Sequence, residues 1–189
     1  MQLPSALPVC QRHLPREIAG ATRNQGRPFG RLPLRWAGAG EEVNCVMEIR
    51  EYRKMYANQV IALWIQCGLV VPWNNPQKDI ERKLKVDREL FLVGIFEGKI
   101  IASVMGGYEG HRGWINYLAV DPAHRRKGYG RQMMEEVERR IRARGCPKIN
   151  LQVRATNEGV IQFYRSLGYV EDKVIGLGKR LEEDEPYQR

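Results

Sequence analysis

The stretch Trp114–Arg144 restricts the possible folds more than any other part of the sequence. An apolar segment typical of a strand, Trp114–Val120, leads through a basic turn into a long charged segment, Gly128–Arg144, with the periodicity of a helix. Gly145 follows this segment and predicts its end. A strand that passes through a short turn into a helix is typical of α/β proteins, so the sequence predicts a sheet covered by helices.

The turn itself has the composition of an anion site. It carries three consecutive cations, Arg125, Arg126 and Lys127, followed by two glycines, Gly128 and Gly130. Charged side chains bond strongly to phosphate, glycines let the backbone approach a ligand, and the N–H groups of a helix N-terminus favour an anion. A solvated basic loop in front of a helix is the alternative interpretation of this pattern by itself.

A second strand-and-helix unit lies later in the chain. Ile149–Val153 has the composition of a strand, Asn157 is placed to cap a helix, and Gly168 is placed to end it. The amphipathic segment between Asn157 and Gly168 carries Tyr164. Two such units in one chain strengthen the prediction of an α/β fold.

The remaining apolar patterns complete the expected order of elements. The dipeptide Glu97-Gly98 predicts a hairpin between two strands. The fold class is therefore α/β, a single domain with a mixed, largely antiparallel central sheet flanked by about four helices. We expect strands at Met47–Tyr52, Leu90–Phe96, Lys99–Tyr108 and, as one or two strands, Tyr169–Leu181, and helices at Tyr56–Gln66 and Gln77–Arg88.

Residues 1–46 differ in kind from the rest of the chain. They are rich in proline and glycine and keep no strand or helix period, which predicts a disordered extension. A clean strand pattern opens at Met47, so we expect Met47 to be the natural start. The folded domain is then expected at 47–182, with an acidic tail at 183–189.

Composition excludes several classes of protein. The net charge of +9 is spread along the chain without interleaved aromatic residues, which leaves nucleic-acid binding a minor possibility. No apolar run has the length of a membrane span, and no signal-peptide core begins the chain, so we expect no membrane association and a cytoplasmic location. Neither a metal site nor a disulfide scaffold is expected, because no close pairs or metal-ligand spacings join Cys10, Cys45, Cys67 and Cys146.

Together the two strand-and-helix units resemble the GCN5-related N-acetyltransferase (GNAT) family. The matching parts are L-A-V-D-P at the strand end, the turn R-R-K-G-Y-G, the segment V-R-A-T-N and the helix F-Y-R-S-L-G-Y, in the family's order and spacing. The resemblance spans about residues 47–182. It implies an enzyme that uses acetyl-CoA as co-substrate and transfers the acetyl group to a primary amine by direct attack. The acceptor is then the amine of a small molecule, a protein or a peptide. The resemblance is also compatible with a homodimer.

The same resemblance assigns acetyl-CoA to the strand end and the turn. The pantetheine arm would pair with the backbone of the strand end, the N–H of Leu118 would polarise the thioester carbonyl, and the N–H groups of the turn would hold the pyrophosphate. Arg125 or Arg126 would reach the adenosine 3′-phosphate, and Asn157 would cap its helix, touch the cofactor, or do both. The expected cofactor-binding residues are Leu118, Ala119, Val120, Arg125, Arg126, Lys127, Gly128, Tyr129, Gly130, Arg131 and Asn157.

Tyr164 is the expected catalytic acid, because the tyrosine at this place in relatives protonates the departing thiolate of CoA. A buried core tyrosine is the other interpretation. The base is less defined, since relatives that acetylate protein N-termini carry a glutamate where this chain has Gln152. Glu109, acting through water, is the expected catalytic base, and His111 is an alternative; both also fit a solvated loop.

The acceptor site in such folds is built between the first two helices and the last strands. That region offers Trp73, Asn74, Asp79 and Glu81, and the two acids fit equally well as charges near a helix N-terminus. A non-catalytic acyl-CoA-binding regulatory module is the alternative function. Mutation of Tyr164 separates the two, because it should lower turnover and spare cofactor affinity.

Overall fold

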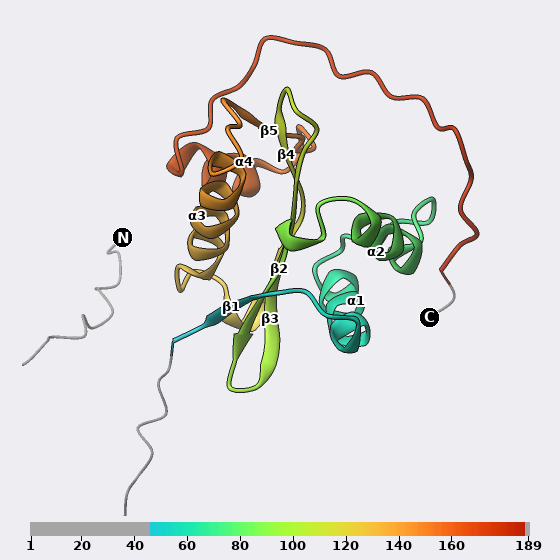
Figure 1. Ribbon diagram of the computed structural model, residues 1–189, viewed down its shortest axis with the longest axis vertical. Coiled ribbons are helices and arrows are strands. Elements are labelled where there is room, and N and C mark those ends of the chain that lie inside the picture. The colour runs from blue at the N-terminus through green and yellow to red at the C-terminus, as the bar shows by residue number, and fades with distance from the viewer. Residues whose placement is uncertain (1–45, 188–189) are drawn as a thin grey trace, which may run out of the picture. The chain divides into compact units, whose positions relative to one another are not determined.

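A computed structural model describes residues 46–187, all of which lie in one compact unit (Figure 1). The predictions of a disordered extension and of a start at Met47 concern residues that are almost all outside this range. Met47 itself is buried, with 4% of its surface exposed. No helix among residues 46–187 is long and apolar enough to cross a membrane.

The described residues form a five-stranded sheet in the order β1-β2-β3-β4-β5. The first four strands pair antiparallel, and β4 pairs with β5 in parallel. This confirms the predicted mixed, largely antiparallel sheet. The strands are β1 (Glu48–Glu51), β2 (Phe91–Phe96), β3 (Lys99–Tyr108), β4 (Gly113–Val120) and β5 (Ile149–Leu151).

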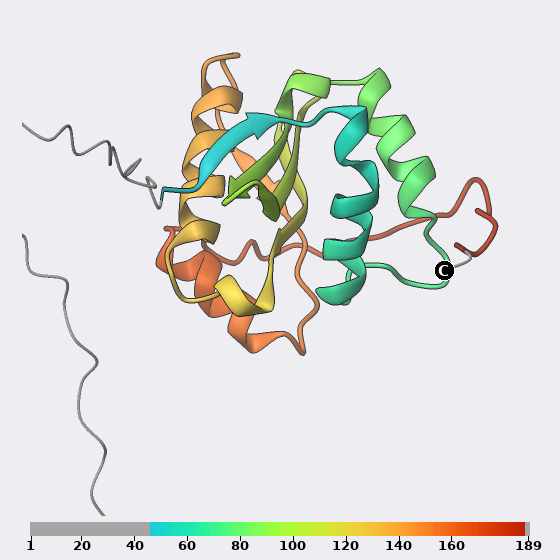
Figure 2. The ribbon, with the colours of Figure 1, turned by 90° about the horizontal axis from the view of Figure 1, so that it is seen from below.

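Helices cover both faces of the sheet (Figure 2). Successive side chains of a strand point to opposite faces of the sheet. In β2, Leu92 joins the apolar cluster under α3 and α4, whereas Phe91 and Val93 join the apolar cluster under α1 and α2. All three are fully buried, which explains the continuous apolar run of this strand. The helices are α1 (Ala57–Gln66), α2 (Pro76–Lys85), α3 (Tyr129–Arg142) and α4 (Glu158–Ser166), with short 3₁₀ turns at Lys54–Tyr56, Arg88–Leu90 and Pro122–His124.

The prediction of one or two strands in Tyr169–Leu181 is wrong, because no strand follows β5 among the described residues. This segment leaves Val174, Ile175 and Leu177 exposed by 78–93%. The strand β5 also ends at Leu151, before the predicted Val153. Its parallel partner β4 bends away beyond Ile115, so the β4–β5 ladder stops there.

Candidate active site

The strands β4 and β5 separate at a bulge in β4. Their pairing is limited to Gly113–Ile115 of β4. Beyond it the register of β4 against β3 shifts, and Tyr117 takes a left-handed φ of 51°. A bulge inserts an extra residue and bends the strand that carries it. Among the strands that the structure describes, none therefore pairs with the end of β4 on its β5 side.

The alternation of the backbone then decides which groups face this gap. The N–H of Asp121 donates to the carbonyl of Ile101 on β3 at 2.8 Å. The backbone groups of Asp121 therefore face β3, and so do those of Ala119, which lies two residues earlier and pairs with Ser103. The backbone groups of Leu118 and Val120 consequently point to the opposite edge. The carbonyl of Val120 already accepts hydrogen bonds from protein side chains, namely Arg125 Nε at 3.1 Å and Cys67 Sγ at 3.4 Å.

A chain of side-chain contacts holds the bulge in place. The ring of Tyr117 stacks on Trp64 with 4.1 Å between centroids. Trp64 Nε1 donates to Ser103 Oγ at 2.8 Å, and that hydroxyl donates to the carbonyl of Tyr117 at 3.3 Å. The hydroxyl of Tyr117 donates to Asp79 at 2.6 Å. Burial, followed by this bond to Asp79, raises the pKa of Tyr117 and keeps its hydroxyl protonated.

Sequence reasoning missed this network. The sequence pattern indicates Asp79 only as an acceptor-site or helix N-terminal charge, and it singles out neither Ser103 nor Tyr117. The available signal was Ser103, a hydroxyl within the apolar run of β3, which is 0% exposed. A buried hydroxyl needs hydrogen-bond partners, and here it has two.

The basic turn between β4 and α3 adopts left-handed conformations at two positions, Arg126 with φ of 64° and Gly128 with φ of 85°. Nothing lies within 4 Å of the position that a Cβ of Gly128 would take, so this glycine serves backbone conformation. Arg125, Arg126 and Lys127 are exposed.

Gly130 has a packing role in addition to the expectation that it lets the backbone approach a ligand. A Cβ at Gly130 would lie 3.2 Å from the ring of Phe163 on α4, so the glycine permits close contact between α3 and α4. The neighbouring Arg131 donates to the carbonyl of Ser166 at 3.1 Å, which joins the same two helices. Tyr129 is half-buried at the first position of α3.

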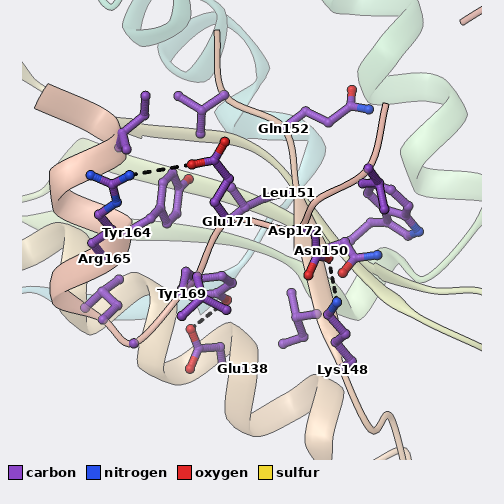
Figure 3. A pocket seen from close by; sticks show the side chains of 18 of the residues that line it. Glu138, Lys148, Asn150, Leu151, Gln152, Tyr164, Arg165, Tyr169, Glu171 and Asp172 are labelled. Atoms are coloured by element: carbon purple, nitrogen blue, oxygen red, sulfur yellow. Dashed lines mark hydrogen bonds and ion pairs between the residues drawn. The ribbon is translucent and has the colours of Figure 1, made fainter. Parts of the chain in front are cut away.

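Tyr164 lies on the buried face of α4 and lines a cavity of about 1110 Å³ between β5, α4 and the segment that follows α4 (Figure 3). Its side chain is 9% exposed, and burial raises its pKa to about 12. The hydroxyl therefore stays protonated at neutral pH. It makes no hydrogen bond to any described residue, so it is free to donate to a ligand.

The expected catalytic base, Glu109, does not line the cavity that contains Tyr164. Glu109 lies in the β3–β4 hairpin and lines a separate cavity of about 230 Å³. Its carboxylate accepts from the backbone N–H groups of Arg112 at 2.7 Å and His111 at 2.8 Å, and these bonds lower its pKa. Gln152, in contrast, lines the cavity of Tyr164.

The carboxylates that line the Tyr164 cavity are each in contact with another side chain. Glu138 accepts from the hydroxyl of Tyr169 at 2.9 Å, and Asp172 pairs with Lys148 at 2.5 Å (Figure 3). Glu171 lies 3.7 Å from Arg165. The cavity therefore brings together a proton donor and carboxylates that already have partners.

The expected acceptor residues are only partly brought together. Asn74 Nδ2 lies 3.5 Å from the hydroxyl of Tyr117, so Asn74 and Asp79 meet at the bulge. Trp73 is 53% exposed beside them, whereas Glu81 is an exposed residue of α2 without a contact to Tyr117. Asn157 accepts from the N–H of Val160 at 3.4 Å, so its expected role as a helix cap is present.

Comparison with known proteins agrees with this architecture. The profile described as the Acetyltransferase (GNAT) family matches residues 57–169. An acetyltransferase of Sodalis glossinidius (strain morsitans) is 49% identical over 142 residues, which cover 75% of this chain and 100% of that relative. An acetyltransferase of Yersinia enterocolitica is 48% identical over 141 residues, with coverage of 75% and 100%. These relatives define the class of the protein, an acetyltransferase.

Solved structures share the fold. The ribosomal-protein-S18-alanine N-acetyltransferase of Escherichia coli aligns with a TM-score of 0.57 and 26% identity, covering 68% of this chain and 80% of that chain. AAC(6')-Iy, solved in complex with a bisubstrate analogue that contains CoA, aligns with a TM-score of 0.60 and 21% identity, covering 71% and 99%. The chain belongs to the GNAT family and is an N-acetyltransferase.

Proposed function

We propose that this acetyltransferase takes acetyl-CoA as its co-substrate and transfers the acetyl group to a primary amine by direct attack. The observation that carries the proposal is the gap between β4 and β5, which presents the outward backbone groups of Leu118 and the N–H of Val120 and ends at the basic turn. A strand edge followed by a helix N-terminus suits a ligand with an amide-bearing arm and a pyrophosphate.

The proposed placement of the cofactor follows this edge. The pantetheine arm runs along Leu118–Val120, and the N–H groups of the turn and the start of α3 bind the pyrophosphate. Arg125 donates to the carbonyl of Val120, which makes the exposed Arg126 and Lys127 the better candidates for the adenosine 3′-phosphate. Asn157 then serves α4 as its cap.

The proposed reaction needs one attack and one protonation. The lone pair of the neutral amine forms a bond to the thioester carbon, and the N–H of Leu118 stabilises the charge on the oxygen. The C–S bond then breaks, and Tyr164 gives its proton to the leaving thiolate. The proton of the acetylated amine passes to water, which also returns a proton to Tyr164.

Solvent is the proposed base because, among residues 46–187, the carboxylates that line the Tyr164 cavity each contact another side chain. Gln152 cannot accept a proton at the place where relatives that act on protein N-termini have a glutamate. Glu109, the base expected from the sequence, uses both carboxylate oxygens within its own hairpin. The two free thiols among the described residues, Cys67 and Cys146, suit a reducing compartment, so we propose a cytoplasmic location, and residues 47–182 as the catalytic domain.

Calorimetric titration with acetyl-CoA and with CoA tests the cofactor site. We expect saturable binding that is lost in Arg126→Glu/Lys127→Glu. The matched control is Lys173→Glu/Lys179→Glu, which makes the same charge change at two exposed lysines outside the turn and should bind like the wild type. Folded wild-type protein that binds neither ligand would refute the proposal.

An amine screen then separates an enzyme from the alternative, a non-catalytic acyl-CoA-binding regulatory module. The screen measures release of CoA thiol with spermidine, kanamycin and a peptide that begins with alanine. Turnover with any of them supports the enzyme. Tight binding of acetyl-CoA without turnover would favour the binding module, provided that Tyr164→Phe also leaves the release of CoA thiol unchanged.

A further inference from the structure

The three lysines of α2 lie in three different environments. Lys85 is exposed to solvent, and Lys78 lies 3.7 Å from the carboxylate of Asp184. Lys83, in the last turn of the helix, is half-buried and lines the cavity of about 230 Å³ that also contains Glu109. The reaction proposed above gives this cavity no role, so the chemistry of Lys83 is a separate question.

Apolar surface forms part of the wall around Lys83. The side chains of Val86 and Trp114 line the cavity together with Gly107. Val86 is 64% exposed and Trp114 is 37% exposed, so the cavity is open to small solutes. Its volume is below the roughly 300–1,000 Å³ of pockets that enclose whole ligands. The cavity therefore suits the small reactive end of a molecule.

The carboxylates that line this cavity are bound to other donors. Asp87 accepts from the backbone N–H of Tyr108 at 3.0 Å and from Arg144 at 2.5 Å. Glu109 uses both carboxylate oxygens within its own hairpin. Among residues 46–187, the side chain of Lys83 forms neither a hydrogen bond nor an ion pair. A partly buried ammonium is thus left without a direct partner.

The charges around Lys83 do not compensate for its burial. Burial lowers the pKa of Lys83, and Asp87 and Glu89 oppose this effect. Both acids bind Arg144, however, whose positive charge lowers the pKa of Lys83 further. Near neutral pH, a larger share of Lys83 is therefore neutral than of an ordinary exposed lysine, and the neutral amine is the nucleophilic form.

We propose that Lys83 is an acetylation site of this protein, and that its amine takes the acetyl group directly from the thioester of acetyl-CoA. The nitrogen lone pair forms a bond to the carbonyl carbon, the C–S bond breaks, and the proton lost by nitrogen passes through water to the departing thiolate. Val86 and Trp114 disfavour an ammonium but accept a neutral acetamide with its methyl group. The reaction uses neither Tyr164 nor the basic turn, so it goes beyond the function proposed above and does not depend on it.

Mass spectrometry of the full chain measures the acetylation rate of each lysine. The chain reacts with acetyl-CoA that carries a heavy-isotope acetyl group, at several pH values from neutral upward. It is then unfolded, the remaining lysines are blocked with unlabelled acetic anhydride, and trypsin cleaves after arginine. Lys83 and Lys85 then lie in the same peptide, Lys83–Arg88, so the two rates share one recovery. A parallel reaction with labelled acetyl phosphate separates the thioester from other activated acetyl groups.

We expect Lys83 to react about fivefold faster than Lys85 near pH 7, or more. The ratio should shrink as the pH rises toward about 10, because the exposed lysine then becomes neutral as well. In urea, where the cavity is lost, the ratio should fall to about one. Tyr164→Phe should leave both rates unchanged.

Two variants change the charges around Lys83 in opposite directions. Arg144→Gln frees Asp87 and Glu89 to face the ammonium and should slow the acetylation of Lys83 about two- to fivefold. Glu89→Gln removes one of these acids and should raise the rate about twofold. Arg139→Gln is the matched control, since it removes an exposed arginine of α3 that pairs with Glu136, and it should change neither lysine.

Equal rates of Lys83 and Lys85 in the folded chain near neutral pH would overturn the proposal. A preference for Lys83 that persists in urea would assign the effect to the local sequence and overturn the role of the cavity. Loss of the reaction in Tyr164→Phe would show transfer by the active site of a second copy, and reaction with acetyl phosphate alone would exclude the thioester; both would overturn direct transfer from acetyl-CoA. Acetylation of Lys83 in a chain that shows no saturable binding of acetyl-CoA would support the proposal and count only against the function proposed above.

Discussion

Removal of the hydroxyl of Ser103 should destabilise the whole domain, because this buried group connects two others. In Ser103→Ala, Trp64 Nε1 loses its acceptor and the carbonyl of Tyr117 loses a donor, and both Ser103 and Trp64 are 0% exposed. Each buried group left without a partner costs about 1–3 kcal/mol. We expect a loss of about 2–4 kcal/mol in the free energy of unfolding, because local relaxation offsets part of the sum.

Urea unfolding followed by far-UV circular dichroism measures this change. With a slope of about 1–3 kcal/mol per molar urea, the midpoint should fall by roughly 1–2 M. Ser103→Cys keeps the size and a weak donor, so its midpoint should lie between those of wild type and Ser103→Ala. Ser166→Ala is the matched control: its hydroxyl is exposed and bonds only within its own helix, to the carbonyl of Phe163 at 2.7 Å.

Loss of the Ser103 hydroxyl should also weaken cofactor binding. The Ser103 hydroxyl fixes the carbonyl of Tyr117, and Tyr117 forms the bulge that parts β4 from β5. Ser103→Ala should therefore also bind acetyl-CoA more weakly at temperatures where it remains folded. If the free energy of unfolding of Ser103→Ala lies within about 0.5 kcal/mol of the wild-type value, as it does for ordinary surface substitutions, the hydroxyl does not hold the bulge.

Four further predictions concern single side chains. Tyr164→Phe should lower kcat about 100-fold and leave the Kd for acetyl-CoA within about twofold, and equal turnover in steady-state assays would remove Tyr164 as the acid. Cys146→Ser should retain turnover, because direct attack needs no covalent nucleophile; mass spectrometry that finds an acetylated Cys146 in the working enzyme would contradict this. Glu109→Gln should lower the urea midpoint, since the carboxylate binds two backbone N–H groups of its hairpin, and should leave kcat unchanged in the same assay. The hydrogen bonds from Arg139 and, after it, Arg140 lower the pKa of Glu136 to about 2, against the opposing effect of burial. This shift adds about 1–3 kcal/mol to the free energy of unfolding. The contribution is fully present above the unfolded-state pKa near 4.5 and is lost as the pH falls toward 2. In Glu136→Gln, the free energy of unfolding should therefore depend less on pH in this range.

The sequence predicts most of the elements because each is specified by local patterns. The strand β4, the turn and α3 follow from an apolar run, glycines and a charged amphipathic segment, and the structure places them as predicted. The end of α2 differs: the predicted Gln77–Arg88 stops at Lys85, because Asp87 takes a left-handed φ of 52°. Left-handed conformation at a residue other than glycine is set by its surroundings, which a local pattern does not contain.

The bulge of β4 lies outside sequence reasoning for the same reason. Tyr117 reads as an ordinary strand residue, and tyrosine is common in strands. Its left-handed backbone depends on Trp64 and Ser103, which are far from it and from each other in the sequence. Gly130 likewise has a packing role that the motif does not reveal, because its contact with Phe163 on α4 depends on the folded chain.

The C-terminal segment shows how much one buried side chain changes the interpretation of a charged sequence. The run Glu182–Glu185 has the composition of a solvated tail, and most such runs are solvated. Three of the four residues are exposed, as composition predicts, and only the side chain of Asp184 is buried against Arg82. A charge pattern does not distinguish the one paired acid from its neighbours, because the pairing depends on where α2 lies in the folded chain. The burial of Asp184 against Arg82 is therefore the observation that distinguishes a docked segment from a solvated tail.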